Sequence, residues 1–151
     1  MDSIDRKIIA ELQHDGRISL TDLADRIGIS LSPCHRRVKT LEQNGVIQGY
    51  RAMIDPSSLG FGFSTLVFVT LRDADRHTVT LLDDALSKIS AITHAQRLFG
   101  DPDYLLHVVA RDLPSFQKLY DEKLIALPGV QRLTSTLVMK TVVPDRAFPV
   151  Q

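Results

Sequence analysis

The stretch Ser30-Leu31-Ser32-Pro33-Cys34-His35-Arg36-Arg37-Val38-Lys39-Thr40-Leu41-Glu42-Gln43-Asn44 determines how the rest of the chain is interpreted. It predicts a helix that Ser30 caps, with Pro33 in the first turn and Gly45 as the stop signal. Three apolar side chains at i, i+4 and i+7 share one buried stripe: Cys34, Val38 and Leu41. The remaining face is basic and rich in hydrogen-bond donors, as a helix in the DNA major groove requires. We interpret the stretch as a recognition helix.

Two further amphipathic helices are predicted before this stretch. Asp2 with Asp5, and Ser19 with Asp22, form capping signals. Apolar side chains at helical spacing follow the two caps: Ile4, Ile8, Ile9 and Leu12, then Leu20, Leu23, Ala24 and Ile27. Gly28 begins a turn of about three residues, the spacing of a helix-turn-helix. The alternative is a three-helix bundle that binds protein, or nothing.

The charge distribution favours DNA over protein as the partner of this region. The 18 basic and 18 acidic residues of the chain cancel, so no overall charge attracts nucleic acid or membrane. Residues 1–29 carry four basic and six acidic groups, whereas residues 30–51 carry four basic groups and one acidic group. The positive charge is therefore local, as expected for a DNA-facing element on a neutral body.

Length and composition indicate an ordinary globular protein. A chain of 151 residues with 44% hydrophobic content can build one domain or two small ones. The single cysteine excludes an internal disulfide, which is consistent with a reducing compartment. The sequence has no apolar signal segment and no run of membrane-spanning length, so we expect a cytoplasmic, nucleoid-associated protein without a membrane partner.

The second half of the chain has a different periodicity. Residues 46–54 are β-prone and predict a connecting strand. Beyond the linker, the expected elements are a strand at 64–71, a helix containing Val79, Leu82, Leu86 and Ile89, strands at 92–99 and 104–110, a helix capped by Asp112, and a strand at 130–143. This order, βαββαβ, is that of the ferredoxin-like fold. The predicted α+β protein has a helix-turn-helix (winged-helix-like) domain at 1–45, a hinge strand and linker at 46–63, and a ferredoxin-like domain at 64–151.

The faces of the predicted sheet suggest a second copy of the chain. In a ferredoxin-like fold both helices cover one face, and the other face is polar unless something covers it. Strands 64–71 and 104–110 carry large apolar side chains on both faces. A homodimer, with the two sheets packed face to face, is the simplest way to cover them.

The chain as a whole resembles the leucine-responsive/asparagine-C (Lrp/AsnC, feast/famine) family of prokaryotic transcriptional regulators. The motifs that carry the resemblance, in order, are Ile4-Asp5-Arg6-Lys7-Ile8-Ile9, Leu12-Gln13-His14-Asp15-Gly16-Arg17, Pro33-Cys34 with Arg37-Val38-x-x-Leu41-Glu42, Gly45-Val46-Ile47-Gln48-Gly49-Tyr50, Gly100-Asp101-x-Asp103-Tyr104, and Leu127-Pro128-Gly129-Val130. The family commonly has Pro where this chain has Leu31. The resemblance implies a DNA-binding domain, a hinge, and a C-terminal domain that senses amino acids and assembles dimers, often into octamers.

The candidate DNA-binding residues are Ser32, Pro33, His35, Arg36, Arg37, Lys39 and Thr40. We expect Ser32, His35 and Arg36 to contact base edges, and Lys39 and Thr40 to contact phosphates. Arg37 lies nearer the buried stripe, so it either contacts a phosphate or pairs with an acidic group of the bundle. A dimer that reads two half-sites predicts a partly palindromic operator in double-stranded DNA.

The candidate effector-binding residues are Gly100, Asp101, Asp103, Tyr104, Thr134, Ser135 and Thr136. The resemblance places a small ligand between C-terminal domains, against the turn 100–104. The carboxylates of this turn suit an ammonium group, and its backbone N–H groups suit a carboxylate. The alternative is a plain turn, because Asp-Pro-Asp favours a type I turn locally, and β-propensity alone explains the three hydroxyls of the last strand.

No catalytic or metal-binding pattern is present. Cys34 and His35 are neighbours on a helix, so their side chains point about 100° apart and cannot form a catalytic dyad. The other histidines lack partners at metal-ligand spacing, and neither a phosphate-binding loop nor a nucleophile elbow occurs. We therefore expect that the protein is not an enzyme and that it binds no cofactor, apart from an amino-acid effector of unknown identity. The competing function is an architectural protein that compacts DNA with little sequence preference.

Overall fold

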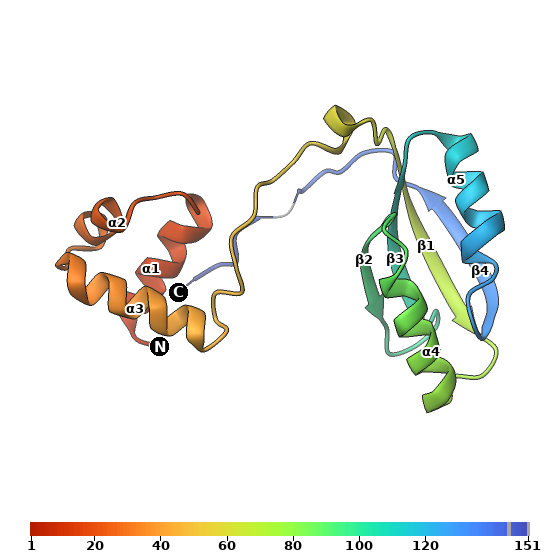
Figure 1. Cartoon of the computed structure of the whole chain (residues 1–151), viewed down its shortest axis with the longest axis horizontal. Helices are drawn as coiled ribbons and strands as arrows, with labels where there is room; N and C mark the ends of the chain where they lie inside the picture. The colour runs from red at the N-terminus through yellow and green to blue at the C-terminus, as the bar shows by residue number, and fades with distance from the viewer. Residues whose placement is uncertain (145, 151) are drawn as a thin grey trace. The chain divides into compact units, whose positions relative to one another are not determined.

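The computed structural model describes residues 1–144 and 146–150 and divides into two compact units (Figure 1). The first unit, called the DNA-binding unit below, contains Met1–Met53 together with the segment from Val142 onward. The second, called the effector unit, contains Ile54–Thr141. Each unit has its own hydrophobic core.

The DNA-binding unit contains three helices, α1 (Ser3–His14), α2 (Leu20–Ile27) and α3 (Leu31–Gln43). Both predicted caps of the first two helices are confirmed. Asp2 and Asp5 form a reciprocal capping box, and the Ser19 hydroxyl accepts the Asp22 N–H at 3.0 Å. Gly28, in the turn between α2 and α3, has a φ of +77°, which a residue with a side chain rarely adopts. Local sequence signals therefore define the helix-turn-helix.

The predicted capping bond of α3 is wrong. Ser30 occupies the N-cap position with extended backbone, but its side chain accepts no hydrogen bond. A capping hydroxyl bonds the N–H of the second or third helical residue, and the third residue here is Pro33, which has no N–H. The same proline that favours the first turn thus removes one donor that Ser30 would have used.

The predicted strand at residues 46–54 is also absent from the described structure. These residues adopt no regular secondary structure and are mostly exposed. A strand needs a partner for its backbone groups, and β-prone composition alone cannot supply one. A short 3₁₀ turn, Pro56–Leu59, follows and is capped by Asp55.

The effector unit has the predicted βαββαβ order. Its elements are β1 (Phe63–Leu71), α4 (Arg76–Ser87), β2 (Ile92–Arg97), β3 (Tyr104–Ala110), α5 (Leu113–Leu119, continued by a π-helical turn at Tyr120–Leu124) and β4 (Val130–Leu137). The strands form one antiparallel sheet in the order β2-β3-β1-β4. Both helices lie on the same side of this sheet (Figure 1).

Two of these strands are shorter than predicted. The sequence predicts a final strand to residue 143, but β4 ends at Leu137, which pairs with Thr65 of β1. Beyond Leu137, the Val138 N–H donates to the carbonyl of Ser64. Because β1 begins at Phe63, few backbone groups of this strand remain to pair with later residues. Strand β2 ends at Arg97 rather than at residue 99, and the Leu98 N–H donates to the carbonyl of Asp103 where the chain turns toward β3.

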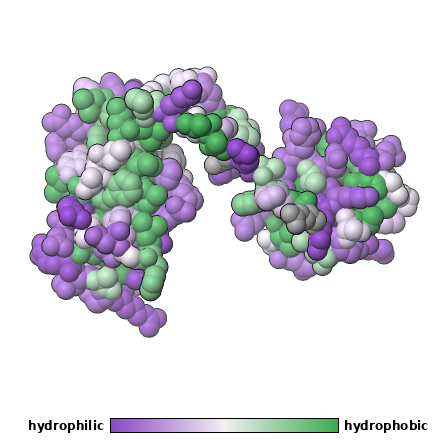
Figure 2. Space-filling view, turned by 180° about the vertical axis from the view of Figure 1, so that it is seen from behind, coloured by the Kyte–Doolittle hydropathy of each residue, from purple (hydrophilic) through white to green (hydrophobic). Residues whose placement is uncertain are grey.

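The uncovered face of the sheet carries half-buried apolar side chains. Leu66 and Phe68 of β1 lie opposite His107 and Leu105 of β3, and all four side chains are partly accessible. Apolar surface gathers on this unit in the view from behind (Figure 2). The sequence predicted this two-sided apolar character, which leaves the exposed face of the sheet open to a partner.

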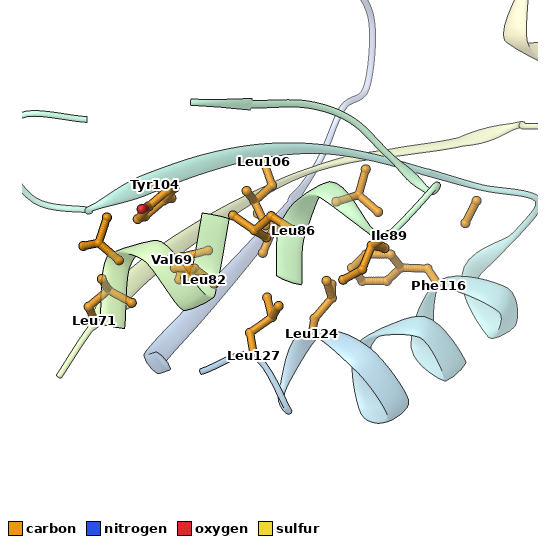
Figure 3. Packing of buried hydrophobic residues seen from close by; sticks show 14 residues of the cluster. Val69, Leu71, Leu82, Leu86, Ile89, Tyr104, Leu106, Phe116, Leu124 and Leu127 are labelled. Atoms are coloured by element: carbon orange, nitrogen blue, oxygen red, sulfur yellow. The ribbon is translucent and has the colours of Figure 1, made fainter. Parts of the chain in front are cut away.

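The covered face forms the main core (Figure 3). Val67 and Val69 of β1 are fully buried beneath Leu82 of α4 and the residues that follow α5. Thr65 shares this face at 2% exposure, and its hydroxyl has no hydrogen-bond partner among the described residues. This packing fixes the adjoining ends of β1 and β3, where the turn 100–104 lies, whereas the other three candidate effector residues lie within β4.

Candidate functional site

The first candidate site is the outer face of α3. The buried stripe of Cys34, Val38 and Leu41 packs into the core of the DNA-binding unit, and this fixes which side of the helix is free. Burial also raises the pKa of the Cys34 thiol, as expected of a core residue rather than a nucleophile. The free face carries Ser32, His35, Arg36 and Lys39, all exposed.

The basic side chains of this face are available for a ligand. Within the part of the chain that the structure describes, the side chains of His35, Arg36 and Lys39 form no hydrogen bond or ion pair. Thr40 differs, because its hydroxyl donates to the carbonyl of Arg36 at 2.9 Å. A phosphate only accepts hydrogen bonds, so Thr40 must give up this bond before it can contact one.

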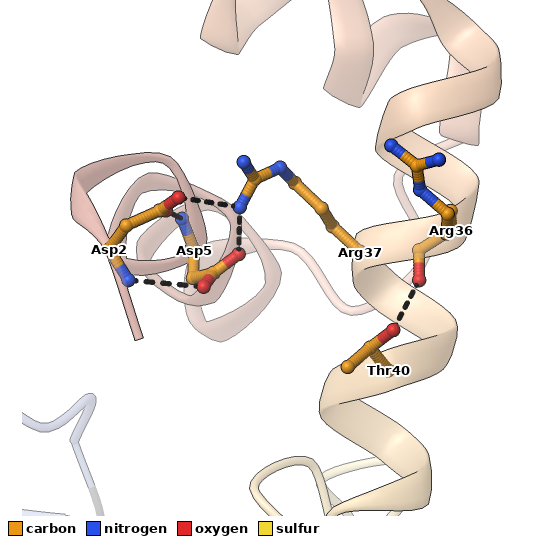
Figure 4. A network of polar contacts seen from close by, with 5 residues as sticks. All are labelled: Asp2, Asp5, Arg36, Arg37 and Thr40. Carbon is orange, nitrogen blue, oxygen red and sulfur yellow. Dashed lines mark hydrogen bonds and ion pairs between the residues drawn. The ribbon is translucent and has the colours of Figure 1, made fainter.

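Arg37 is occupied by the fold (Figure 4). Its Nη1 donates to Asp2 Oδ2 at 2.8 Å and to Asp5 Oδ1 at 2.7 Å. These bonds, that to Asp5 foremost, raise the pKa of the guanidinium, while the Asp5 N–H and then Arg37 hold the pKa of Asp2 below its usual value. Of the two roles that the sequence left open for Arg37, the structure shows the pair with the bundle. The pair joins α3 to the N-terminus of α1.

Two contacts of the DNA-binding unit were not predicted. The Tyr50 hydroxyl donates to Glu42 Oε1 at 3.1 Å and so joins the hinge to the end of α3. The side-chain amide of Gln13 donates to the Phe148 carbonyl at 3.2 Å and accepts the Phe148 N–H at 2.7 Å. The second contact joins residues 135 positions apart in sequence, and no sequence pattern could have indicated it.

The second candidate site is the turn 100–104, where two of the predicted residues are engaged in the fold. The Asp103 carboxylate accepts the Leu71 N–H at 2.7 Å, and the Asp103 N–H donates to the Val69 carbonyl at 2.9 Å. Strand β1 extends beyond the first residue of β3, so Asp103 supplies an acceptor where the neighbouring strand has ended. This carboxylate holds the turn against the end of β1.

Tyr104 points into the core rather than outward. It is 2% exposed, and its hydroxyl donates to Asp83 Oδ1 of α4 at 2.7 Å. Burial, and secondly the bond to Asp83, raises the pKa of Tyr104 to about 12. The sequence did not single out Asp83, because its role depends on α4 lying against the start of β3.

The remaining effector candidates divide between the two faces of the sheet. Thr134 and Thr136 lie opposite Phe68 and Leu66, so they share the uncovered face, whereas Ser135 lies opposite Val67 and points to the helix side. Asp101 is exposed and lies 3.4 Å from the Thr70 hydroxyl and 3.9 Å from the guanidinium of Arg132. Gly100 has a φ of +140°, so a side chain there would be strained.

Comparison with known families gives two matches that together span most of the chain. Residues 1–48 match the family model for winged helix-turn-helix DNA-binding domains. Residues 64–148 match the model for the Lrp/AsnC ligand-binding domain. The chain belongs to the Lrp/AsnC family of transcriptional regulators. The ferredoxin-like arrangement and the helix-turn-helix are thus the two parts of an Lrp/AsnC protein, which is a DNA-binding regulator with a ligand-binding domain.

Relatives of known sequence and structure agree with this assignment. The leucine-responsive regulatory proteins of Escherichia coli (strain K12) and Klebsiella pneumoniae are each 39% identical over 142 residues, which is 94% of this chain and 87% of theirs. A transcriptional regulator of Neisseria meningitidis, solved as its L-Met complex, is 30% identical with a TM-score of 0.92, covering 99% of this chain and 96% of that one. An AsnC family regulator of Agrobacterium tumefaciens is 28% identical with a TM-score of 0.91, covering 99% and 97%.

The Lrp/AsnC family consists of transcriptional regulators, so the expectation of a non-enzyme agrees with the family assignment. Among the described residues, no three His, Cys, Asp or Glu side chains gather where they could hold a metal ion. In the same part of the chain, no helix is both long and apolar enough to span a membrane.

Proposed function

We propose that α3 reads operator DNA through Ser32, His35 and Arg36, while Lys39 and Thr40 contact phosphates. The observation that carries this proposal is the exposed basic face of α3, whose charged side chains are unpaired in the described structure while the opposite stripe is buried. An arginine can bond both acceptors of a guanine, which distinguishes this base from the others. Pro33 supports the helix start beside these residues. Arg37 acts indirectly, by fixing α3 against α1 through Asp2 and Asp5.

The active form in this proposal is at least a homodimer, with octamers as the larger assembly. The half-buried apolar face formed by Leu66, Phe68, Leu105 and Val109 supports a second copy as its cover. One small helix-turn-helix contacts few bases, and two copies read two half-sites. We therefore propose that the operator is partly palindromic. We also propose that the protein is cytoplasmic and associated with the nucleoid, because its DNA targets are there. In this division residues 1–45 bind DNA, residues 46–63 form the linker, and residues 64–151 bind the effector and assemble, except that the segment from Val142 onward packs with the DNA-binding unit.

The effector in this proposal is a free amino acid. Two findings support it: the Lrp/AsnC ligand-binding domain at residues 64–148 and the structural relative solved with L-Met. The residues proposed to contact the amino acid remain Gly100, Asp101, Asp103, Tyr104, Thr134, Ser135 and Thr136. Among them, the exposed Asp101 has the greatest freedom to receive an ammonium group, because Asp103 and Tyr104 are engaged within the unit.

The test is binding of the full chain to DNA from upstream of its own gene, at fixed salt, with and without each common amino acid. We expect tight binding that resists competitor DNA and that one or a few amino acids shift. Arg36→Ala should lose preference for the site, while Arg111→Ala, an exposed arginine in the effector unit, should not.

Two results would contradict parts of the proposal. Tight binding that no amino acid alters would remove the amino-acid effector and keep the DNA-binding role. Binding that falls steeply with salt and shows no preferred site in a pool of genomic fragments would favour the architectural alternative.

A further inference from the structure

Two histidines lie against each other on the uncovered face of the sheet. His94 of β2 is paired with His107 of β3, and their rings meet edge to face with centroids 5.4 Å apart. Along β3, His107 alternates with Leu106 and Val108, which are buried beneath the helices, so both histidines point away from the helices. His94 is exposed and His107 is half-buried. Within the described residues, neither imidazole has a hydrogen-bond or ion-pair partner.

A bulge in β2 places His94 on this face. The pairing of β2 with β3 shifts register between Ile92 and His94 and skips Thr93. Had the register of Ile92 continued, His94 would lie opposite Leu106 and would face the helices. Thr93 donates its hydroxyl to the carbonyl of His107 at 3.3 Å and thereby holds the bulge against β3. A specific irregularity of the strand therefore brings the two imidazoles together.

The surroundings of this histidine pair, His94 and His107, are uncharged. Across the sheet the pair adjoins Leu66 of β1, which in turn lies opposite Thr136 of β4. The neighbouring positions along the strands on this face are Gln96, Leu105, Phe68, Thr134, Val109 and Ser64. Both helices of the unit lie on the other side of the sheet, so they bring no charge against the pair (Figure 1).

Charged groups on or next to this face lie farther from the histidine pair. Arg132 lies four positions along β4 from Thr136, and Arg111 follows β3, four positions beyond His107. Four residue positions span about 13 Å of strand. Arg132 also has the carboxylate of Asp101 at 3.9 Å. A second copy packed on this face at neutral pH therefore meets apolar and neutral groups around the pair, and no like charges oppose it.

Acid changes this match, because histidine is the side chain that ordinarily gains a proton between about pH 8 and pH 5. In a face-to-face homodimer the same face of both chains is enclosed, so the two histidine pairs share one interface. Protonation would place like charges side by side within each pair and bury them away from water. We propose that the histidine pair is a pH-sensitive switch for the homodimer, which is stable while the imidazoles are neutral and separates when they are protonated. The inference rests on the proposed function, which supplies the second copy on this face.

The direction of the effect follows from the state that binds protons more readily. A histidine in water has a pKa of about 6.5, and enclosure beside a second imidazole favours its neutral form. The separated chains therefore bind more protons than the dimer, and the stability of the dimer is lost as pH falls through this range. With one proton released per chain on assembly, the dissociation constant rises about 100-fold between about pH 7.5 and about pH 5.5. Operator binding should weaken in the same range, since two half-sites need two chains.

The test is the dissociation constant of the full chain, measured by sedimentation velocity over a dilution series at about pH 7.5 and about pH 5.5. The unaltered chain should show the rise of about 100-fold at the lower pH. The double variant His94→Gln and His107→Gln keeps polar side chains that cannot gain a proton, so its two constants should be nearly equal. The matched control is the double variant His14→Gln and His77→Gln, which changes exposed histidines on α1 and α4 and should keep the full rise.

His94→Glu tests the electrostatic origin of the switch. A carboxylate opposite His107 favours the protonated imidazole, whereas His94 disfavours it. At about pH 5.5 this variant should therefore form a tighter dimer than the unaltered chain. A weaker dimer would contradict repulsion within the histidine pair as the cause.

The outcomes separate this inference from the proposed function. If the chain dimerises equally well at both pH values, or if the His94→Gln, His107→Gln variant keeps the full rise, the switch is wrong and the homodimer stands. If the unaltered chain stays single at both pH values, or if Phe68→Asp leaves the dimer intact, the face-to-face dimer is wrong and so is the switch. Thermal unfolding of each variant at both pH values checks the fold. If the double variant does not fold, the single variants replace it, and each should lose part of the rise.

Discussion

Helix α3, which is proposed to read DNA, and the turn 100–104 both stand out as sequence motifs, but their polar residues are engaged differently in the structure. On α3, Arg36 and Lys39 are exposed and unpaired in the described structure, so they are available to DNA. In the turn, Asp103 bonds the Leu71 N–H and Tyr104 bonds Asp83, so both stabilise the effector unit itself. A motif therefore marks a constrained position, and only the contacts show whether the constraint comes from a ligand or from the fold.

The largest effect is expected from glycines with left-handed backbone, one in each unit. In Gly129→Ala the new Cβ would clash with the Cγ2 of Thr78, on a backbone with φ +72°. Backbone strain of about 1–2 kcal/mol and overpacking of about 1–3 kcal/mol should add in the free energy of unfolding. Gly28→Ala has the backbone strain alone, because no other atom of the described residues lies within 4 Å of the new Cβ. Denaturant unfolding measures both variants.

Thr78→Ser tests the origin of this difference. Serine lacks the clashing methyl group and keeps the hydroxyl that donates to Asp75. In the Gly129→Ala background, it should recover most of the excess over Gly28→Ala. Equal costs for the two glycine variants would show that the contact with Thr78 is unimportant.

The two neighbouring arginines of α3 should separate DNA recognition from stability. Arg36→Ala should weaken binding to the preferred site by about 1–3 kcal/mol, or roughly 5- to 150-fold, because a base contact is lost. Its thermal midpoint should stay nearly unchanged, since the side chain has no partner among the described residues. Binding titrations on the preferred site and on a scrambled site measure the effect. An equal loss on both sites would mean that Arg36 contacts phosphate rather than a base.

The two aspartates of the turn should differ in stability. Asp103→Ala leaves the Leu71 N–H without its acceptor, and Leu71 is only 6% exposed, so unfolding should become easier by about 1–3 kcal/mol. Asp101→Ala is the matched control, because Asp101 is exposed and makes only long contacts. Urea titrations of the full chain compare them. If Asp101→Ala proves as destabilising, the turn is held by a different contact.

A smaller gain in stability is expected in the effector unit from Thr65→Val. The Thr65 hydroxyl is buried and has no partner among the described residues, so removing it relieves a desolvation cost of about 1 kcal/mol. Valine has a similar shape and favours strands. The thermal midpoint should therefore rise slightly, and a fall would mean that the hydroxyl has a partner in solution.

The smallest effect concerns acid stability of the DNA-binding unit. The pKa of Asp2 is lowered on folding, first by the Asp5 N–H and then by Arg37, so its contribution is present above the unfolded value of 3.8 and is lost as pH falls through the folded value. Arg37→Gln removes part of this lowering. Its thermal midpoint should therefore fall less steeply with acidification than that of Arg36→Gln, whose side chain is outside the network. Identical pH profiles would exclude a role for Arg37 in this dependence.

Local signals predicted most of the fold. The caps at Asp2 and Ser19, the left-handed Gly28 and the helical stripes depend on residues a few positions apart, and the structure confirms them. The prediction of a capping bond from Ser30 was wrong, because Pro33, only three residues away, lacks the N–H donor that this bond requires. The predictions of a strand at 46–54 and of a β4 that reaches residue 143 were wrong, because a strand needs a partner and sequence composition does not specify one.

The two candidate sites were also predicted only in part, because some of their features depend on local sequence and others on tertiary packing. The exposed face of α3 follows from helical periodicity alone, so its residues could be named in advance. The engagement of Asp103 with Leu71 joins positions 32 residues apart, and the bond from Tyr104 to Asp83 depends on the docking of α4. Such contacts are consequences of tertiary packing, and they decide which polar groups remain free for a ligand.

The contact between Gln13 and Phe148 has a topological consequence. Because the segment from Val142 onward belongs to the same unit as α1, the effector unit is inserted within the DNA-binding unit rather than appended to it. No single cut of the chain can therefore separate the two units with both complete. A protease that cleaves in the hinge would leave the last segment of the DNA-binding unit attached to the effector fragment, and two cuts would be needed to release the effector unit alone.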